Sequence, residues 1–215
     1  VWTTTPWTLP SNQAAAIHPA VTYVEVVVGD ERLIVAQPLV ERVFGEGHTI
    51  AATLTAADLV GRNYDPPFPF VAGAHRIVAA DFVTTEDGTG IVHIAPAFGE
   101  DDMAVGRAND LPLTNPVDKQ GRFNEQIVGF AGQFVKDADR GLIEDLERRG
   151  RLVREQTYTH TYPHCWRCST PLLYYAKPSW YIRTTQVRDR LIELNQTIGW
   201  QPEHVRDGRF GRWLE

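Results

Sequence analysis

The alternation of apolar and polar positions divides this chain into short strands and a few amphipathic helices. Residues 21–28 are rich in β-branched and aromatic side chains, Gly29-Asp30 interrupts them, and residues 33–36 resume the pattern. This arrangement predicts a β-hairpin. Residues 76–83 predict another strand, and residues 91–95 predict its return after a glycine-rich turn.

Helical spacing separates these strands. Helices are predicted at residues 40–44 and 56–60, from about residue 101 or 102, at residues 136–149, and in the tail at 187–198. Asp101 and Asp102 suit a helix N-terminus, because carboxylates cap it and favour its dipole. Gly150 suits the C-terminal cap of the helix at 136–149.

The order of these elements predicts the fold class. Strands dominate between the helices without regular β-α-β alternation, so we expect an α+β fold with a mixed, barrel-like β core decorated by short helices. Three parts are expected: a main body at residues 1–158, a cysteine-containing peptide with its return segment at 159–180, and a C-terminal extension at 181–215. The abrupt ends predict a piece of a longer protein.

Composition limits the class of protein. The chain has 215 residues, 43% of them hydrophobic, which is enough for a sizeable core. It has no run of about 18 apolar residues that could span a membrane and no signal-peptide pattern, so we expect a cytoplasmic protein without a membrane partner.

Charge is unevenly placed. Residues 1–150 hold 11 Lys and Arg against 21 Asp and Glu, whereas residues 151–215 hold 10 against 6. The basic final third is the better candidate for contact with nucleic acid, because phosphate binding needs local positive charge. Uneven solvated surfaces explain the same counts equally well.

The two cysteines, Cys165 and Cys168, form a Cys-x-x-Cys motif. This spacing suits a thiol redox pair or half of a tetrahedral zinc site, which normally needs four protein ligands. His160 and His164 lie nearby in sequence, but His164 adjoins Cys165, and adjacent residues rarely reach one metal. The second half of a zinc site is missing from the sequence.

Residues 2–11 form the most unusual segment. Four threonines lie among two tryptophans, two prolines, a leucine and a serine, which favours a rigid, polar-lined loop that can hold a ligand, although a strand edge followed by a turn is also compatible. The chain lacks a Gly-x-Ser-x-Gly elbow, a phosphate-binding glycine loop and a His-Glu-x-x-His helix. A catalyst built from these residues would position water rather than attack the substrate itself.

Several co-linear motifs then resemble one family. They are Thr-Thr-Thr-Pro-Trp-Thr-Leu-Pro-Ser-Asn at 3–12, Gly-Thr-Gly-Ile-Val-His-Ile-Ala-Pro at 88–96, Phe-Gly-Glu-Asp-Asp at 98–102, Tyr-Pro-His-Cys-Trp-Arg-Cys at 162–168, Pro-Ser-Trp at 178–180, and the stretch from Pro202 to Leu214. Together they resemble the editing domain of isoleucyl-tRNA synthetase and its return to the synthetic domain. Related valyl and leucyl enzymes typically have arginine where this chain has Thr5, and they lack the equivalent of His93.

The resemblance implies hydrolysis of valine wrongly esterified to isoleucine tRNA, with valyl-adenylate as an open alternative substrate. A pocket sized for isoleucine cannot strongly reject a side chain one methylene smaller, a limit for which isoleucyl-tRNA synthetase is itself the standard example, so a second site must remove the error. By similarity, His93 blocks isoleucine and Asp102 binds the valine ammonium. A buried core histidine and a simple helix cap are the alternative interpretations of these two residues.

The resemblance assigns the remaining site residues. Loop hydroxyls and amides would contact the terminal adenosine and the ester carbonyl and hold the attacking water, assisted by a ribose hydroxyl. The candidate catalytic residues are Thr4, Thr5, Thr8, His93 and Asp102, and the candidate substrate-binding residues are Trp2, Thr3, Trp7, Asn12, Ala95 and Phe98. Trp2 and Trp7 are equally compatible with anchoring the core.

The expected partners are the acceptor end of isoleucine tRNA and valine or valyl-adenylate, bound by a monomer. Editing is expected to need no cofactor, and ATP and magnesium would act only in the synthetic domain of the full-length protein. By the same resemblance, Cys165 and Cys168 match the second pair of the family's zinc ligands, and the first pair would lie before Val1. This chain is therefore expected to bind zinc weakly or not at all.

Two other functions are compatible with parts of the sequence. A non-catalytic RNA-binding module would explain the basic final third but leaves the threonine loop without a role. A thiol oxidoreductase would need its cysteines at a strand-to-helix turn. Pro163 and Pro171 argue against a helix there.

Overall fold

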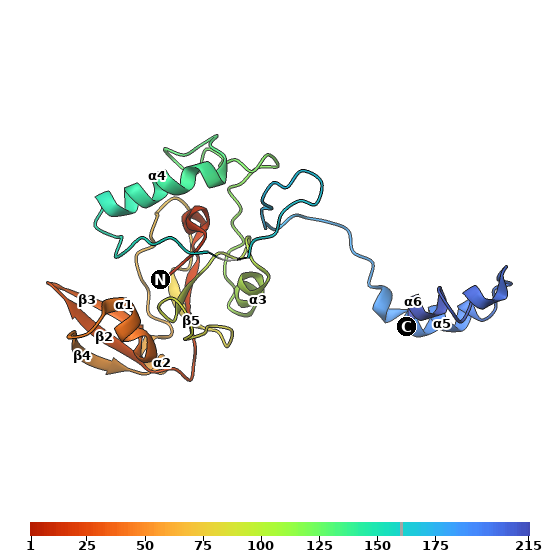
Figure 1. The fold of residues 1–215 in the computed structure, drawn as a ribbon, viewed down its shortest axis with the longest axis horizontal. Helices are drawn as coiled ribbons and strands as arrows, with labels where there is room; N and C mark the ends of the chain where they lie inside the picture. Colours follow the sequence, from red (N-terminus) through yellow and green to blue (C-terminus); the bar gives the residue numbers. More distant parts are fainter. Residues whose placement is uncertain (160) are drawn as a thin grey trace. The chain divides into compact units, whose positions relative to one another are not determined.

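A computed structural model describes residues 1–159 and 161–215 (Figure 1). The chain divides into two compact units, Val1–Ala176 and Lys177–Glu215. Each unit is described by itself. The three-part division at residues 158 and 180 stays a prediction.

The first unit contains a three-stranded sheet with the order β5-β1-β6. Strand β1 (Ala14–Ile17) runs parallel to β5 (Arg76–Ala79) and antiparallel to β6 (Ile91–Ile94). The prediction that residues 91–95 return beside residues 76–83 was wrong, because β1 lies between them. The four residues of β1 are all buried and show no alternation, so the sequence pattern did not reveal this strand.

The second sheet has the order β3-β2-β4. The predicted hairpin is confirmed: β2 (Tyr23–Val28) pairs with β3 (Glu31–Ala36), and Gly29 between them has a φ of +61°. Strand β4 (Thr49–Leu54), which was not predicted, pairs with the other edge of β2.

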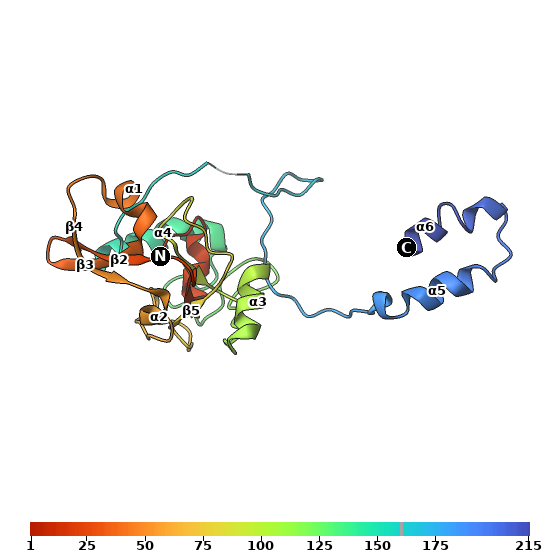
Figure 2. The ribbon, with the colours of Figure 1, turned by 90° about the horizontal axis from the view of Figure 1, so that it is seen from below.

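Short helices pack against this second sheet. The 3-10 helix η2 (Gln37–Leu39), α1 (Val40–Phe44) and α2 (Ala56–Leu59) contribute Leu39, Val40, Ala56 and Leu59 to its core (Figure 2). Both α-helices were predicted, and both are confirmed. A capping box between Thr55 and Asp58 begins α2.

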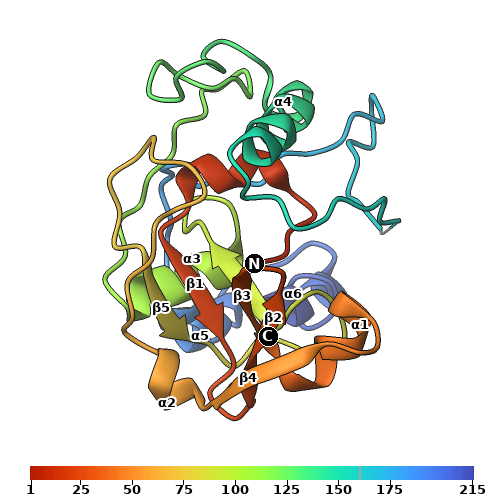
Figure 3. The ribbon, with the colours of Figure 1, turned by 90° about the vertical axis from the view of Figure 1, so that its left-hand side faces the viewer.

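Helix α4 (Val135–Arg148) packs against the 3-10 helix η1 (Pro6–Ser11) near the start of the chain (Figure 3). Trp7 and Leu9 of η1 share a buried cluster with Leu142 and other residues of α4. The amphipathic pattern predicted α4 correctly, and Gly150 has the expected left-handed φ, at +65°. The opening segment is therefore fixed to a core helix.

Helix α3 (Glu100–Ala108) follows β6, as the carboxylates at its start predicted. In the second unit the elements are η3 (Thr184–Gln186), α5 (Arg188–Asn195), η4 (Glu203–Val205) and α6 (Gly211–Leu214). The α5 helix confirms the predicted tail helix. The mixed α+β class is confirmed, and no described helix is long and apolar enough to cross a bilayer.

Candidate functional site

A pocket of about 290 Å³ lies where the opening segment, β6 and α3 meet. The chain reaches this place because Trp2 forms a bridge with Val92 beside β6, and η1 then leads into β1 on the other edge of β6. The residues that line the pocket are Trp2, Thr3, Thr4, Thr5, Trp7, Thr8, Val92, His93, Ala95, Phe98, Asp102, Tyr162 and Tyr174.

His93 is a buried residue in the lining of this pocket. Its side chain is buried, and Nε2 lies 2.8 Å from the hydroxyl of Thr8, which is buried as well. The Thr8 hydroxyl donates its only proton to the carbonyl of Thr5, at 2.8 Å. The hydrogen between the ring and Thr8 must therefore come from Nε2 of His93.

Asn12 orients the other side of the same ring. Its Nδ2 lies 3.4 Å from Nδ1 of His93 and donates to the carbonyl of Ala14 at 3.0 Å. The hydroxyl of Tyr64 donates to Oδ1 of Asn12 at 2.7 Å, which sets the orientation of the amide. Nδ1 of His93 is thus the acceptor, in agreement with a hydrogen on Nε2.

Burial keeps the imidazole of His93 neutral. Burial is the principal cause that lowers the pKa of the imidazole from 6.5 to about 4. Both ring nitrogens are hydrogen-bonded within the protein, to Thr8 and Asn12. The imidazole therefore presents an uncharged surface to a ligand and does not act as an acid. The structure retains both interpretations of this residue, because His93 is a satisfied buried histidine that also lines the pocket.

Asp102 lies in the first turn of α3 and faces the same pocket. Its Oδ1 accepts a hydrogen bond from the backbone N–H of Ala95 at 2.7 Å. Burial raises the pKa of this carboxyl, and the Ala95 hydrogen bond partly opposes the shift. A Cβ at Gly99 would lie 2.5 Å from Oδ2 of Asp102, so glycine leaves room for the carboxylate. An ammonium ion in the pocket would favour the ionised form.

The threonine side chains differ in how far the protein uses their hydroxyl groups. Thr3 Oγ1 accepts the N–H of Thr5 at 3.0 Å, and Thr8 is engaged by His93 and Thr5. The hydroxyls of Thr4 and Thr5 contact only each other among the described residues, at 3.5 Å. They are the hydroxyls most available to a ligand or a water molecule.

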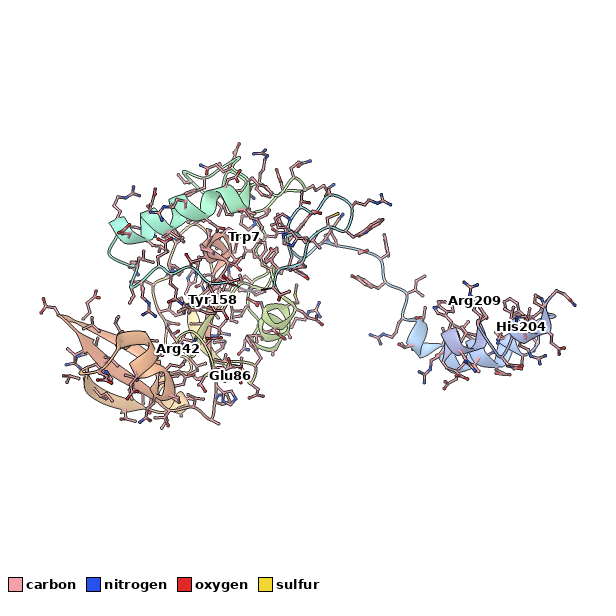
Figure 4. All side chains as sticks on the ribbon, in the orientation of Figure 1. Trp7, Arg42, Glu86, Tyr158, His204 and Arg209 are labelled. Atoms are coloured by element: carbon pink, nitrogen blue, oxygen red, sulfur yellow. The ribbon has the colours of Figure 1, made fainter. Side chains whose placement is uncertain are left out.

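The pocket collects the predicted catalytic and substrate-binding residues with one exception. Asn12 lies outside the lining, behind His93, although it was expected to contact the substrate. Trp7 lines the pocket and also belongs to the buried core cluster that includes residues of α4 (Figure 4). Both expectations for this side chain, pocket wall and core anchor, therefore apply. The rings of Trp2 and Tyr158 pack in a T-shaped arrangement, with their centroids 5.3 Å apart.

Val92, Tyr162 and Tyr174 also line the pocket and were not predicted as site residues. Val92 neighbours His93 on β6, and the two tyrosines flank the Cys-x-x-Cys motif. An aromatic residue on each side of that motif was a visible signal, but only long-range folding brings them to the pocket. A second hollow of about 370 Å³ lies beside α3 and has no candidate site residue in its lining, which consists of Pro96, Met103, Gly106, Arg107, Asp110, Leu111 and Leu113.

Comparison with known proteins relates the whole chain to isoleucine–tRNA ligases. No family model matches the chain. Its whole length aligns with isoleucine–tRNA ligases, at 56% identity over 218 residues with that of Streptomyces avermitilis and at 48% over 229 residues with that of Mycobacterium tuberculosis H37Rv. The chain is homologous to a segment of isoleucine–tRNA ligases. It spans about a fifth of their length, 21% and 22% respectively.

Two solved structures of leucyl-tRNA synthetase domains have a similar fold. The chain resembles the crystal structure of GlLeuRS-CP1 with a TM-score of 0.55 at 15% identity, covering 73% of this chain and 83% of that one. It resembles the editing domain of the cytosolic leucyl-tRNA synthetase of P. knowlesi with a TM-score of 0.51 at 10% identity, covering 81% and 82%. The resemblance to a synthetase editing domain is confirmed at the level of the fold.

The cysteine pair of this ligase homologue lies in a tight turn. The N–H of Cys165 donates to the carbonyl of Thr170, and the N–H of Ser169 donates to the carbonyl of Cys165, both at 2.8 Å. No helix begins at this turn, in contrast to what a thiol oxidoreductase would need. Two thiols on one turn fit half of a tetrahedral zinc site.

The described residues do not complete that zinc site. They contain no group of three or more His, Cys, Asp or Glu side chains that could hold a metal ion. His164 lies beside the pair in sequence, and its Nδ1 is 2.9 Å from the carbonyl of Tyr162. His160 lies outside the described residues.

Proposed function

We propose that this chain hydrolyses the ester that joins valine to isoleucine tRNA. One observation carries the proposal: a single small pocket collects the threonine segment, a neutral histidine and a carboxylate, in a homologue of isoleucine–tRNA ligases. The fold shared with synthetase editing domains supports the same function. Valyl-adenylate is proposed as a second substrate, because it carries the same aminoacyl group.

The two ends of the amino acid would meet different residues. Asp102 binds the α-ammonium group, since a partly buried carboxylate forms a strong charge-assisted hydrogen bond with it. The valine side chain lies against the imidazole of His93. Because protein packing admits an extra methylene only with strain, isoleucine would clash with this fixed ring.

The surrounding residues would hold this arrangement. Thr8 and Asn12 act as positioning residues for His93, because they bind its two ring nitrogens. Trp2, Trp7, Ala95 and Phe98 form apolar walls, and Thr3 supports the backbone of Thr5. Asn12 thus has an indirect role in place of the expected substrate contact.

Water is the proposed nucleophile. The hydroxyls of Thr4 and Thr5 hold it next to the ester carbonyl, because the protein uses these two hydroxyls least. The water oxygen forms a bond to the carbonyl carbon, and the bond from that carbon to the ribose oxygen breaks. A vicinal ribose hydroxyl relays one water proton to the leaving oxygen, and the carboxyl group of the released valine loses its proton to solvent.

A direct deacylation assay tests the proposal. The chain is mixed with isoleucine tRNA charged with valine, and separately with the same tRNA charged with isoleucine. We expect faster release of valine than of isoleucine, beyond the spontaneous rate. Binding of the tRNA without release would instead support an RNA-binding module that uses the basic residues 151–215, and equal release of both amino acids would contradict the role of His93.

The cysteine turn has a separate proposed role. Cys165 and Cys168 supply one half of a structural zinc site whose other ligands belong to the remainder of the synthetase. Zinc there would crosslink two segments of the chain and would not take part in hydrolysis.

A further inference from the structure

The segment that follows the main body returns to the pocket. Residues 161–176, here called the strap, fold back on themselves at the cysteine turn: the N–H of Leu172 donates to the carbonyl of Pro163 at 3.0 Å, and the hydroxyl of Tyr162 donates to the carbonyl of Leu172 at 2.6 Å. Tyr162 and Tyr174 of the strap both line the pocket. The pocket wall is therefore built partly from a segment that begins more than 50 residues after the end of α3.

Tyr174 differs from the other aromatic side chains around the pocket. Trp2, Phe98 and Tyr162 each contact another ring or a cation: Trp2 meets Tyr158 with 5.3 Å between centroids, Phe98 meets Trp7 with 5.0 Å, and the Lys136 ammonium lies 4.0 Å from the centroid of Tyr162. Tyr174 is 60% exposed, and within the described part of the chain its side chain has no hydrogen bond or ring contact. Its ring is available to a ligand.

The backbone on each side of Tyr174 is fixed. Leu173 packs against the core cluster of α4, and a Cβ at Gly121 would lie 2.8 Å from its Cδ1. The N–H of Ala176 donates to the carbonyl of Ala97 at 2.5 Å, and Asn115 donates to the carbonyl of Ala176 at 3.3 Å. An aromatic ring on a fixed backbone binds a flat ligand with little loss of conformational entropy.

We propose that Tyr174 is the stacking platform for the purine base of the terminal adenosine, an inference that rests on the proposed function. In that function the ammonium group and the side chain of the amino acid lie at Asp102, which is partly buried, and at His93, which is buried. The nucleoside then lies toward Thr4 and Tyr174, which line the same pocket and are exposed. Every base has a π-face, and stacking of a base on an aromatic side chain contributes about 1–3 kcal/mol.

Binding of two probes tests this inference. The first is the amide analogue of valyl-adenosine, in which nitrogen replaces the ester oxygen, and the second is valinamide, which lacks the nucleoside. Tyr174→Leu should weaken binding of the analogue by about 5- to 150-fold, corresponding to that stacking energy, and should leave valinamide binding unchanged. Tyr174→Phe, which keeps the ring, should bind the analogue within about twofold of the original chain.

Two further measurements make the result specific. Trp166→Leu is the matched control, because Trp166 is 85% exposed on the same strap but does not line the pocket. The adenine proton resonances of the bound analogue should shift upfield by ring current, and Tyr174→Leu should abolish the shift.

The outcomes separate the two proposals. Binding of the analogue to Tyr174→Leu within about twofold of the original affinity would overturn the stacking role, while loss of both probes in Asp102→Asn would still support the proposed function. Failure of the original chain to bind either probe would overturn both.

Discussion

The hydroxyl of Thr8 lies 2.8 Å from Nε2 of His93, and the two residues are 85 positions apart in the chain. This contact joins η1 to β6 in the lining of the pocket. Because the Thr8 proton is donated to Thr5, the pair also fixes which nitrogen of His93 carries hydrogen. The shape of the pocket thus depends on the same hydrogen bonds that hold the opening segment in place.

Thr8→Val should destabilise the fold. The variant leaves the buried Nε2–H of His93 without its partner, and an unsatisfied buried donor costs about 1–3 kcal/mol of the free energy of unfolding. Urea denaturation measures this loss. Thr4→Val is the control, because Thr4 is exposed and should change stability by less than about 0.5 kcal/mol. Equal stability of the two variants would contradict the positioning role of Thr8.

His93→Ala should relax the choice between amino acids. Removal of the ring enlarges the pocket by more than a methylene group, and one methylene is worth about 10- to 200-fold in discrimination. We expect the ratio of valine release to isoleucine release from charged isoleucine tRNA to fall at least about tenfold. An unchanged ratio, with circular dichroism showing a folded variant, would rule out His93 as the excluding wall.

Asp102→Asn should impair hydrolysis without unfolding the chain. The amide oxygen can still accept the Ala95 N–H, but the charge opposite the substrate ammonium is lost. Removing one charge of a buried, hydrogen-bonded ion pair costs about 2–5 kcal/mol of binding free energy. We therefore expect at least about 30-fold slower release of valine at low substrate concentration.

Asp101→Asn is the matched control for that variant. Asp101 is an exposed neighbour in the same helical turn and does not line the pocket. Its substitution should leave the rate within about twofold of the original. If both variants release valine equally fast, Asp102 does not bind the ammonium group.

Asp139 should make stability fall as pH rises. Its Oδ1 accepts the Trp7 N–H at 2.7 Å, and burial raises the pKa of the carboxyl from 3.8 to about 6. Between these values the folded state binds more protons than the unfolded state, so the free energy of unfolding decreases from about pH 4 to pH 6. Because Asp139 is partly solvent-exposed, we expect its contribution to be about 1–2 kcal/mol.

The comparison with Asp139→Asn isolates this effect. The lowered pKa of His93 acts in the opposite direction, because the unfolded state then binds more protons as pH falls from 6.5 to about 4. This contribution is common to both proteins and cancels in their difference. Urea titrations from pH 4 to 7 should show the variant gaining stability relative to the original chain as pH rises, and a constant difference would contradict the burial of Asp139.

The cysteine pair should not retain zinc tightly in this chain. Two thiols offer only half of a tetrahedral ligand set, and the described residues contain no cluster that completes it. After dialysis against a mild chelator, metal analysis should find far less than one zinc ion per chain, with no further decrease in Cys165→Ser. One tightly held zinc per chain would contradict the half-site.

Elements with strong local signals could be predicted from the sequence. The β2–β3 hairpin follows from β-branched runs around Gly29, and α4 follows from apolar residues at helical spacing ending before Gly150. The candidate pocket residues came from motifs that resemble a known family, and their gathering around one pocket required the fold. Strand β1 was not predicted, because its residues are all buried and therefore show no alternation of apolar and polar positions.

The sequence by itself determined the hairpin, the main helices, the mixed α+β class and the resemblance to a synthetase editing domain, because each depends on neighbouring residues or on motifs that can be read directly. Only the tertiary structure decided that β1 separates β5 from β6, that Asn12 stands behind His93, and that Tyr174 reaches the pocket. These relationships arise from contacts between distant parts of the chain, which packing and hydrogen-bond satisfaction select and local sequence does not encode.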